Sequence, residues 1–282
     1  MSFTIAITGK GGVGKTTLAG LLVTRLVARG CRPILAVDAD PNMCLDVLLG
    51  VKAEHTVGRL REEAREIAGR GLSVGISKRD LLELKISQSL VEGPEFDLIA
   101  MGRPEGPGCY CYANNVLKVT LEEIAASYPF AVIDNEAGLE NLSRRIVQKA
   151  DLLVLVSDPS ERGLATVDRL LELAREMKVE YGRLAVVVNR LRTPLFSEAA
   201  ERLRDSIRPD YFVGLPEDQA LAELGEKGGS LWALKEPNEV VARVDNLLSE
   251  IGLLTVPMGT ASQGVSERNQ RELVDCEVPR KG

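Results

Sequence analysis

The chain has 282 residues, of which 45% are apolar and 27% are charged. This length is enough for one large α/β domain or two small ones with a buried core, and the composition excludes wholesale disorder. The net charge of −6 argues against non-specific binding of nucleic acid. No apolar run reaches the roughly 18 residues of a membrane-spanning helix, and Met1–Thr8 show no secretory signal pattern. We therefore expect a cytoplasmic protein without nucleic-acid or membrane partners.

Short β-branched apolar runs alternate with longer helical patterns along most of the chain. This alternation predicts the α/β class, a single doubly wound, mostly parallel sheet with helices on both faces. The predicted strands are Phe3–Thr8, Pro33–Asp38, Phe96–Met101, Phe130–Asp134, Leu152–Val156, Leu184–Val188 and Tyr211–Val213. The predicted helices are Lys15–Arg29, Leu117–Ala126, Leu139–Lys149, Ala165–Met177, Ser197–Arg208 and Asn238–Ile251.

The domain organisation is read from changes in composition. Residues 51–95 are charged and amphipathic, and we expect them to form helices on the rim of the sheet. From Thr255 onward the chain becomes polar, with glycines and serines close together. The sequence thus predicts one domain over residues 1–254 and a polar, mobile tail over residues 255–282.

The run GKGGVGKTT follows the first predicted strand and opens the first predicted helix. That context identifies a phosphate-binding P-loop. Glycines let backbone N–H groups turn inward around phosphate oxygens, and the helix dipole favours negative charge there. We expect Lys15 to reach the β- and γ-phosphates and the Thr16 hydroxyl to ligate Mg²⁺. The predicted nucleotide-binding residues of this loop are Gly9, Lys10, Gly11, Gly12, Val13, Gly14, Lys15, Thr16 and Thr17.

Lys10 is unusual because a second lysine is not needed to neutralise phosphates within one chain. With it, the loop resembles that of the deviant Walker-A ATPases, the family of nitrogenase iron protein, MinD and ParA. The resemblance implies that Lys10 contacts nucleotide across a homodimer interface and joins Lys15 as a catalytic phosphate lysine. A solvated loop lysine is the alternative.

Two predicted strands end in acidic segments: VDADPN spans the end of the second strand, and AVIDNEAG spans the end of the fourth. Loops at strand ends are where an α/β sheet binds its ligands. Asp40 matches the family's switch I aspartate, the carboxylate that activates the attacking water and lies near magnesium. Asp134 has the form of a Walker B aspartate that would hold Mg²⁺ through water, and Gly138 would let switch II move. For Asp38 we expect a structural or indirect magnesium role, and exposed turn carboxylates remain the alternative.

The identity of the base is indicated by a third strand end. No Asn-Lys-x-Asp guanine motif occurs, and the run Val186–Val188 ends in Asn189. The resemblance implies that this asparagine lies against the adenine ring. ATP is therefore favoured over GTP.

Cys109 and Cys111 lie in the segment GRPEGPGCYCYANN, whose prolines and glycines predict a loop. In an extended segment, residues i and i+2 point the same way, so both thiolates could reach one ion. Soft-ligand metals usually take four donors, and no histidine lies nearby. A two-fold partner would complete a Cys₄ site on the dimer axis. Two unreactive cysteines or a redox-active loop are the alternatives.

This segment, together with DNEAGLENLSRR, resembles the nickel-insertion ATPases that mature carbon monoxide dehydrogenase (the CooC type) and their relative serving acetyl-CoA synthase. The similarity runs from residue 1 to about residue 250. It implies one Ni²⁺ or Zn²⁺ per dimer on the two cysteines, ATP and Mg²⁺ as cofactors, and a nickel enzyme such as carbon monoxide dehydrogenase or acetyl-CoA synthase as partner.

Two other classes stay open. An electron-transfer ATPase like nitrogenase iron protein would use two cysteines from separate loops, but Asn135–Leu142 contains none. A positioning ATPase like MinD or ParA would need an amphipathic C-terminal helix or a basic patch. Thr255–Gly282 is polar and contains helix breakers, and the chain is acidic.

Overall fold

The computed structural model describes residues 2–69, 77–103, 111–135 and 149–253. Within these residues, eight strands form one sheet in the order β3-β4-β2-β5-β1-β6-β7-β8. Neighbouring strands run parallel except for β3 and β4, which confirms the mostly parallel sheet. The strands are β1 Phe3–Gly9, β2 Ile34–Asp38, β3 Leu90–Glu92, β4 Phe96–Ala100, β5 Phe130–Asp134, β6 Lys149–Ser157, β7 Glu180–Leu191 and β8 Tyr211–Pro216.

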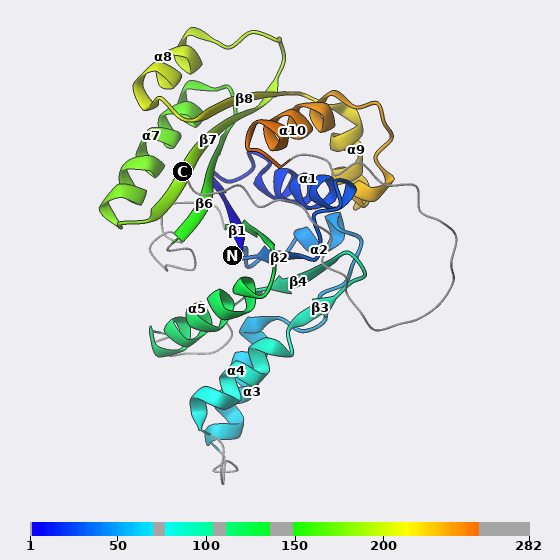
Figure 1. Ribbon diagram of the computed structural model, residues 1–282, viewed down its shortest axis with the longest axis vertical. Coiled ribbons are helices and arrows are strands. Elements are labelled where there is room, and N and C mark those ends of the chain that lie inside the picture. The colour runs from blue at the N-terminus through cyan, green and yellow to red at the C-terminus, as the bar shows by residue number, and fades with distance from the viewer. Residues whose placement is uncertain (1, 70–76, 104–110, 136–148, 254–282) are drawn as a thin grey trace.

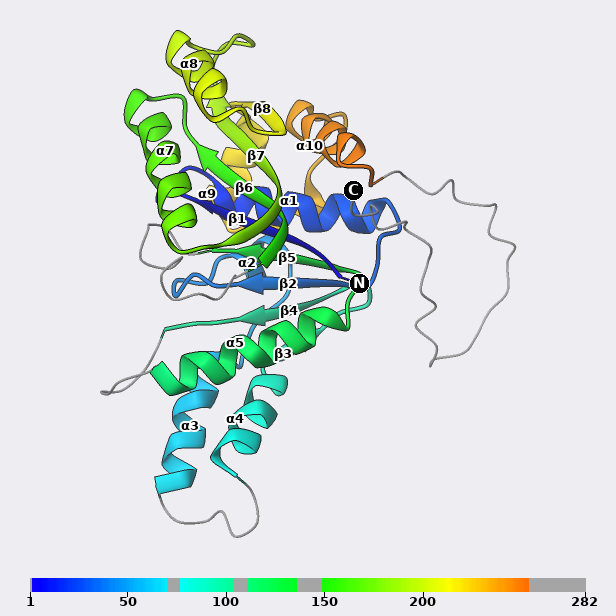
Figure 2. The ribbon, with the colours of Figure 1, turned by 60° about the vertical axis from the view of Figure 1, so that its left-hand side comes forward.

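Helices cover both faces of the sheet, as predicted (Figures 1 and 2). On one face lie α1, α2 and α10, and on the other lie α4, α5, α7 and α8. The helices are α1 Lys15–Ala28, α2 Leu45–Leu48, α3 Val57–Gly69, α4 Lys78–Ser87, α5 Cys111–Ala126, α7 Glu161–Glu176, α8 Glu198–Ile207, α9 Gln219–Lys227 and α10 Glu239–Glu250, with a 3₁₀ helix η1 at Leu231–Ala233. No helix in the described ranges has the length and apolar character needed to cross a membrane.

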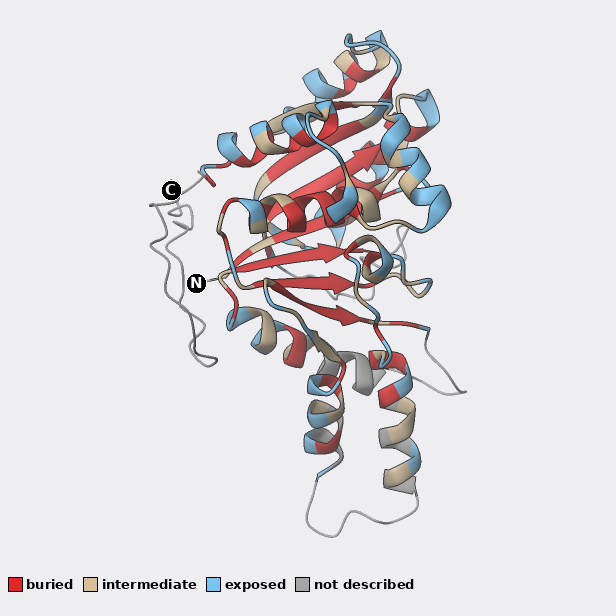
Figure 3. Ribbon diagram, turned by 90° about the vertical axis from the view of Figure 1, so that its right-hand side faces the viewer, coloured by how far each residue is buried: buried red, intermediate tan, exposed pale blue. Residues whose placement is uncertain are grey.

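The central strands are buried on both faces because alternate residues of each strand enter different cores. Ile5 and Ile7 pack on the side of α1 and α10, whereas Ala6 packs on the side of α7. Figure 3 shows the central strands as mostly buried, with exposed residues concentrated on the outer sides of the helices that cover them. The double burial explains the unbroken apolar runs in the sequence.

Most predicted helix ends agree with the structure because capping residues fix them. The hydroxyl of Ser197 accepts a hydrogen bond from the Ala200 N–H and begins α8, and Arg208 ends it in a left-handed conformation. Asn238 caps α10 in the same way through the Val241 N–H. Such caps are local in sequence and can be read from it.

Several predicted boundaries are wrong: α7 begins at Glu161 rather than Ala165, β7 spans Glu180–Leu191 rather than Leu184–Val188, and β8 ends at Pro216 rather than Val213. α5 begins at Cys111 rather than Leu117, so Cys111 is helical and not part of an extended loop. Lys149 opens β6 instead of ending a helix, because it pairs with Glu180 of β7. The helix predicted from Leu139 and the tail from Thr255 lie outside the described residues.

Residues 51–95 contain α3, α4 and the antiparallel edge strand β3. The two helices pack against each other and project from the sheet, as Figures 2 and 3 show. The side chain of Lys85 pairs with Glu63 between them. The expectation of rim helices is thus confirmed, while β3 was not predicted.

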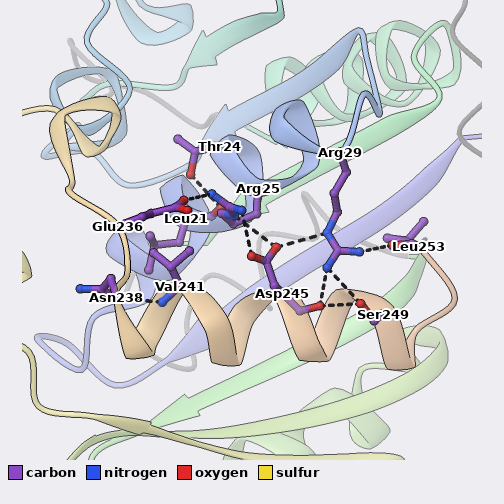
Figure 4. A network of polar contacts seen from close by, with 10 residues as sticks. All are labelled: Leu21, Thr24, Arg25, Arg29, Glu236, Asn238, Val241, Asp245, Ser249 and Leu253. Carbon is purple, nitrogen blue, oxygen red and sulfur yellow. Dashed lines mark hydrogen bonds and ion pairs between the residues drawn. The ribbon is translucent and has the colours of Figure 1, made fainter. Parts of the chain in front are cut away.

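A polar network fastens α1 to α10 at the carboxyl end of α1 (Figure 4). The Arg29 guanidinium, 6% exposed, donates to the Asp245 carboxylate, the Ser249 hydroxyl and the Leu253 carbonyl. Arg25 pairs with the same carboxylate at 2.9 Å and also with Glu236. A buried guanidinium is stable only when its donors are satisfied, so this network fixes where α10 lies.

Candidate functional site

The carboxyl ends of β1, β2 and β5 bring three predicted site segments to one edge of the sheet. Asp38 and Asp134 are paired in the register of β2 and β5, and Asp134 is also paired with Ile7 of β1. Gly9 ends β1 beside them. The P-loop, the switch I segment and the start of switch II therefore meet at a single place, as the sequence predicted for such a fold.

The P-loop forms the expected turn between β1 and α1. Gly14 adopts a left-handed φ of 94° directly before Lys15, the first residue of the helix. The Lys15 ammonium turns back over the loop and lies 3.3 Å from the Lys10 carbonyl oxygen, and its side chain is 6% exposed. Lys10 itself is exposed. The loop thus holds one lysine inward and presents the other to the outside.

Asp134 is a buried carboxylate without a hydrogen bond of normal geometry. The residue is 1% exposed, and neither of its oxygens has a partner among the described residues. Burial raises the pKa of Asp134 from 3.8 to about 7; the neighbouring Thr16 hydroxyl lowers it in part and the Asp38 carboxylate raises it further. Two orphaned acceptor oxygens facing a phosphate loop suit a bound cation or its water.

Asp38 organises the loop that carries Asp40. Its carboxylate accepts hydrogen bonds from the backbone N–H groups of Asp40, Cys44 and Leu45, each at 3.0 Å. Burial raises the pKa of Asp38 in spite of these bonds. The expectation of a structural role for Asp38 agrees with this arrangement. Asp40 is half-buried and its Oδ1 accepts from the backbone and side-chain nitrogens of Asn42, at 2.8 and 3.0 Å.

Asn189 reaches the P-loop from the end region of β7. Its Nδ2 donates to the Val13 carbonyl at 2.8 Å. Beside it lies a cavity of about 220 Å³, bounded by α1, α9 and the loop after β8. The lining includes Gly14, Thr17, Asn189, Pro216, Glu217 and Leu221.

The loop Pro216–Asp218 is a part of this site that the sequence analysis missed. The predicted strand stopped at Val213, whereas β8 continues to Pro216 and delivers the loop to the same edge as the P-loop. The signal was present in Asp218, whose carboxylate caps α9 through the Leu221 N–H. A capping aspartate two residues after a Gly-Leu-Pro strand end marks a strand-to-helix turn.

The cysteine segment is described only from Cys111 onward. Cys109 and Gly138 lie outside the described residues. In the described ranges no group of three or more histidine, cysteine or acidic side chains could hold a metal ion. Cys44, in the switch I loop, is exposed, and desolvation with the surrounding carboxylates raises the pKa of its thiol.

Comparisons with known proteins agree with this geometry. A family model described as the CobQ/CobB/MinD/ParA nucleotide-binding domain matches residues 4–231. The chain is 42% identical over 248 residues to an uncharacterised ATP-binding protein of Methanocaldococcus jannaschii, covering 88% of this chain and 97% of that one. It is 31% identical over 242 residues to the carbon monoxide dehydrogenase accessory protein CooC of Rhodospirillum rubrum, covering 82% and 89%.

Among solved structures, the cell division ATPase MinD of Pyrococcus furiosus has the same fold. The TM-score is 0.66 at 20% identity, over 89% of this chain and 99% of that one. Eight strands in one mostly parallel sheet, a P-loop between β1 and α1 and the matched family model lead to one conclusion. The chain belongs to the CobQ/CobB/MinD/ParA family of nucleotide-binding proteins and is a P-loop ATPase.

Proposed function

We propose that this ATPase is a metallochaperone that carries Ni²⁺ between two subunits and delivers it to a nickel enzyme such as carbon monoxide dehydrogenase. The observation that carries the proposal is that β4 and β2 are parallel neighbours and end at the same edge of the sheet. β2 leads into the switch I loop of the nucleotide site, and β4 leads along the sequence into the segment with Cys109 and Cys111. The 31% identity to a carbon monoxide dehydrogenase accessory protein supports the same assignment.

The nucleotide site fits magnesium-bound ATP. Lys15 at the start of α1 would bind the β- and γ-phosphates, and the glycine turn would leave room for them. Thr16 and the orphaned Asp134 oxygens would hold Mg²⁺ directly or through water, with Asp40 near it. The metal supplies positive charge that offsets the charge of the transferring phosphoryl group. Asn189 and the cavity beside it would take the adenine ring.

Asp40 is the residue we assign to hydrolysis. It is half-buried and lies two residues after Asp38, the last residue of β2. Its Oδ1 accepts hydrogen bonds from Asn42, and it forms no ion pair with a basic side chain among the described residues. A carboxylate in that position can accept a proton from, or orient, an attacking water. The sequence by itself identifies no arginine finger, so we expect slow hydrolysis.

The proposed active form is a homodimer. Lys10 is exposed, and its side chain forms no hydrogen bond or ion pair among the described residues, which leaves its ammonium available to a second copy. Cys109 and Cys111 of two subunits would supply four thiolates to one ion on the two-fold axis. Cys111 is the first residue of α5.

The decisive experiment is an anaerobic Ni²⁺ titration with native mass determination. Wild-type protein should bind one Ni²⁺ per two chains, and a Cys109→Ser/Cys111→Ser variant should lose both the tight site and the metal-dependent dimer. Cys44→Ser is the matched control, because Cys44 is an exposed thiol that could bind metal adventitiously. Equal binding by the double variant and the wild type would remove the metallochaperone assignment.

The same preparation distinguishes the other classes. A brown iron–sulfur chromophore in the anaerobic protein would favour electron transfer. The MinD-like fold makes a positioning ATPase the second candidate. ATP-dependent binding to vesicles of anionic phospholipid, together with absence of nickel binding, would favour that candidate.

A further inference from the structure

A chain of hydrogen bonds joins switch I to the start of the cysteine segment. The Arg103 guanidinium donates to the Asn42 side-chain oxygen at 3.1 Å, across 61 positions of sequence. The Asn42 side-chain nitrogen donates in turn to Asp40 Oδ1 at 3.0 Å. The carboxylate that we assign to hydrolysis is therefore two hydrogen bonds away from Arg103.

Asn42 and Arg103 have the donors and acceptors that this series of hydrogen bonds requires. An asparagine amide offers one acceptor and two donors, so Asn42 can accept from Arg103 while it donates to Asp40. The Asn42 backbone N–H also donates to Asp40 Oδ1 at 2.8 Å, which fixes the turn. A guanidinium stays charged at any physiological pH, and it can bond the amide oxygen only when the amide keeps this orientation.

Hydrogen bonds and packing fix the backbone near Asp40 and near Arg103. Any movement in this series of hydrogen bonds must therefore be a movement of side chains. Asp40 is held through its N–H by the buried Asp38 carboxylate. Met101, two residues before Arg103, donates to the Asp38 carbonyl and accepts from the Gly58 N–H, both at 2.8 Å. A Cβ at Gly58 would lie 2.3 Å from the Arg103 carbonyl oxygen, so α3 contacts the Arg103 backbone directly.

We propose that Asn42 and Arg103 are positioning residues that couple the nucleotide state of Asp40 to the segment that begins at Arg103 and carries the two cysteines. This inference rests on the proposed function. In this structure Asp40 accepts a hydrogen bond from Asn42, and Asn42 accepts one from Arg103. When Asp40 turns to the nucleotide and its water, Asn42 loses its partner and Arg103 is released. Coupling of this kind is reciprocal, so metal on the cysteines changes nucleotide affinity by the same factor.

The coupling is measured as the ratio of Ni²⁺ dissociation constants without and with a non-hydrolysable ATP analogue and Mg²⁺. In the wild type we expect a ratio of about fivefold or more, in the range of allosteric coupling. One ordinary hydrogen bond changes an equilibrium by about fivefold, so Asn42→Ala and Arg103→Ala should each bring the ratio below about twofold. The Asn42→Ala/Arg103→Ala double variant should lower the ratio no further than either single variant does. Arg103→Lys should retain part of the wild-type ratio.

Two controls separate coupling from damage. Arg202→Ala removes an exposed arginine of α8 and should leave the ratio unchanged. Trp232 is the sole tryptophan, stacks on Phe96 and donates to the carbonyl of Leu49 next to α2, so its fluorescence reports on the switch I side of the site. We expect the analogue to change this fluorescence equally in wild type, Asn42→Ala and Arg103→Ala.

The outcomes distinguish the inference from the function on which it rests. A wild-type protein that binds no Ni²⁺ overturns the proposed function, and the coupling with it. Wild-type binding that does not depend on nucleotide leaves the metal site standing and overturns the coupling. Nucleotide-dependent binding that Asn42→Ala and Arg103→Ala retain in full overturns the role of these two residues alone.

Discussion

Asp38 and Asp134 stand opposite each other in the register of β2 and β5, yet their carboxylates have opposite hydrogen-bonding states. Three backbone N–H groups bond Asp38, whereas no described group bonds Asp134 with normal geometry. Two buried carboxylates side by side also repel, and the Asp38 charge contributes to the raised pKa of Asp134. Asp38 is thus part of the scaffold of switch I, whereas the Asp134 oxygens have no hydrogen-bond partner among the described residues, as the proposed Mg²⁺ site requires.

Replacing Asp134 by asparagine should stabilise the nucleotide-free protein at alkaline pH. The pKa of Asp134 is 3.8 in a free chain and about 7 in the fold, so the native state binds an extra proton between these values. The associated stabilisation is fully present below pH 4 and is lost as the pH rises to 7 and above. Asp134→Asn removes this pH dependence, and at pH 8 it should raise the free energy of unfolding by on the order of 3 kcal/mol.

The measurement is thermal unfolding without nucleotide or metal between pH 5 and pH 8. Asp38→Asn is the matched variant, because its amide places a donor against backbone N–H groups that need acceptors. We expect it to lower stability at pH 8 by about 1–3 kcal/mol. If both variants raise, or both lower, the free energy of unfolding at pH 8, the different roles assigned to Asp38 and Asp134 are wrong.

Gly14→Ala and Gly12→Ala should weaken ATP binding to different extents. Both residues have a left-handed φ, of 94° and 77°, which an alanine adopts at a cost of about 1–2 kcal/mol. A Cβ at Gly14 would also lie 2.4 Å from the Asn189 side-chain nitrogen, whereas a Cβ at Gly12 meets nothing within 4 Å. Calorimetry should show roughly tenfold weaker ATP for Gly12→Ala and a larger loss for Gly14→Ala.

Asn189→Ala should weaken ATP binding by about fivefold, because the Val13 carbonyl of the P-loop loses its side-chain donor. Asn189→Asp should weaken it further, since a carboxylate would face that carbonyl. Titration with ATP and GTP checks both variants, with ATP preferred by the wild type. Asn246→Ala, on α10 and away from the P-loop, serves as the control. Unchanged ATP affinity in Asn189→Ala would exclude this residue from the base site.

Arg29→Ala should destabilise the fold without affecting nucleotide affinity. The variant leaves the Asp245 carboxylate and the Leu253 carbonyl without a buried donor, at a cost of about 2–3 kcal/mol, or roughly 5–8 °C in Tm. Arg29 lies at the far end of α1, about 21 Å along the helix from Lys15. Arg25→Ala, at a more exposed position, should cost less. A changed ATP affinity in Arg29→Ala would show that α1 transmits strain to the P-loop.

The sequence alone predicted the parts of this protein that depend on neighbouring residues. The P-loop from Gly9 to Thr17 is a strand end, a glycine turn and a helix start, and each is encoded within a few positions. The caps Ser197 and Asn238 are equally local. The unbroken apolar strands fixed the fold class, because only a sheet covered on both faces needs them.

Boundaries that depend on pairing were predicted less well. Lys149 is in a strand because β7 lies beside it, and nothing in its own neighbourhood specifies that. The edge strand β3 is short and pairs with only one neighbour, β4, so it leaves no apolar run to recognise. The loop after β8 joined the candidate site because parallel strands end at one edge, a property of the assembled sheet.

By itself, then, the sequence determined an α/β P-loop ATPase and the residue types of its site, since periodicity, caps and the glycine turn are short-range features. The tertiary structure alone decided which of two similar aspartates accepts the backbone hydrogen bonds and which has no hydrogen-bond partner among the described residues. It also brought Arg103 to Asn42, because a contact across 61 residues depends on β2 and β4 lying side by side. The desolvation of a carboxylate, its repulsion by a second carboxylate and its long-range contacts arise only when folding buries distant segments together.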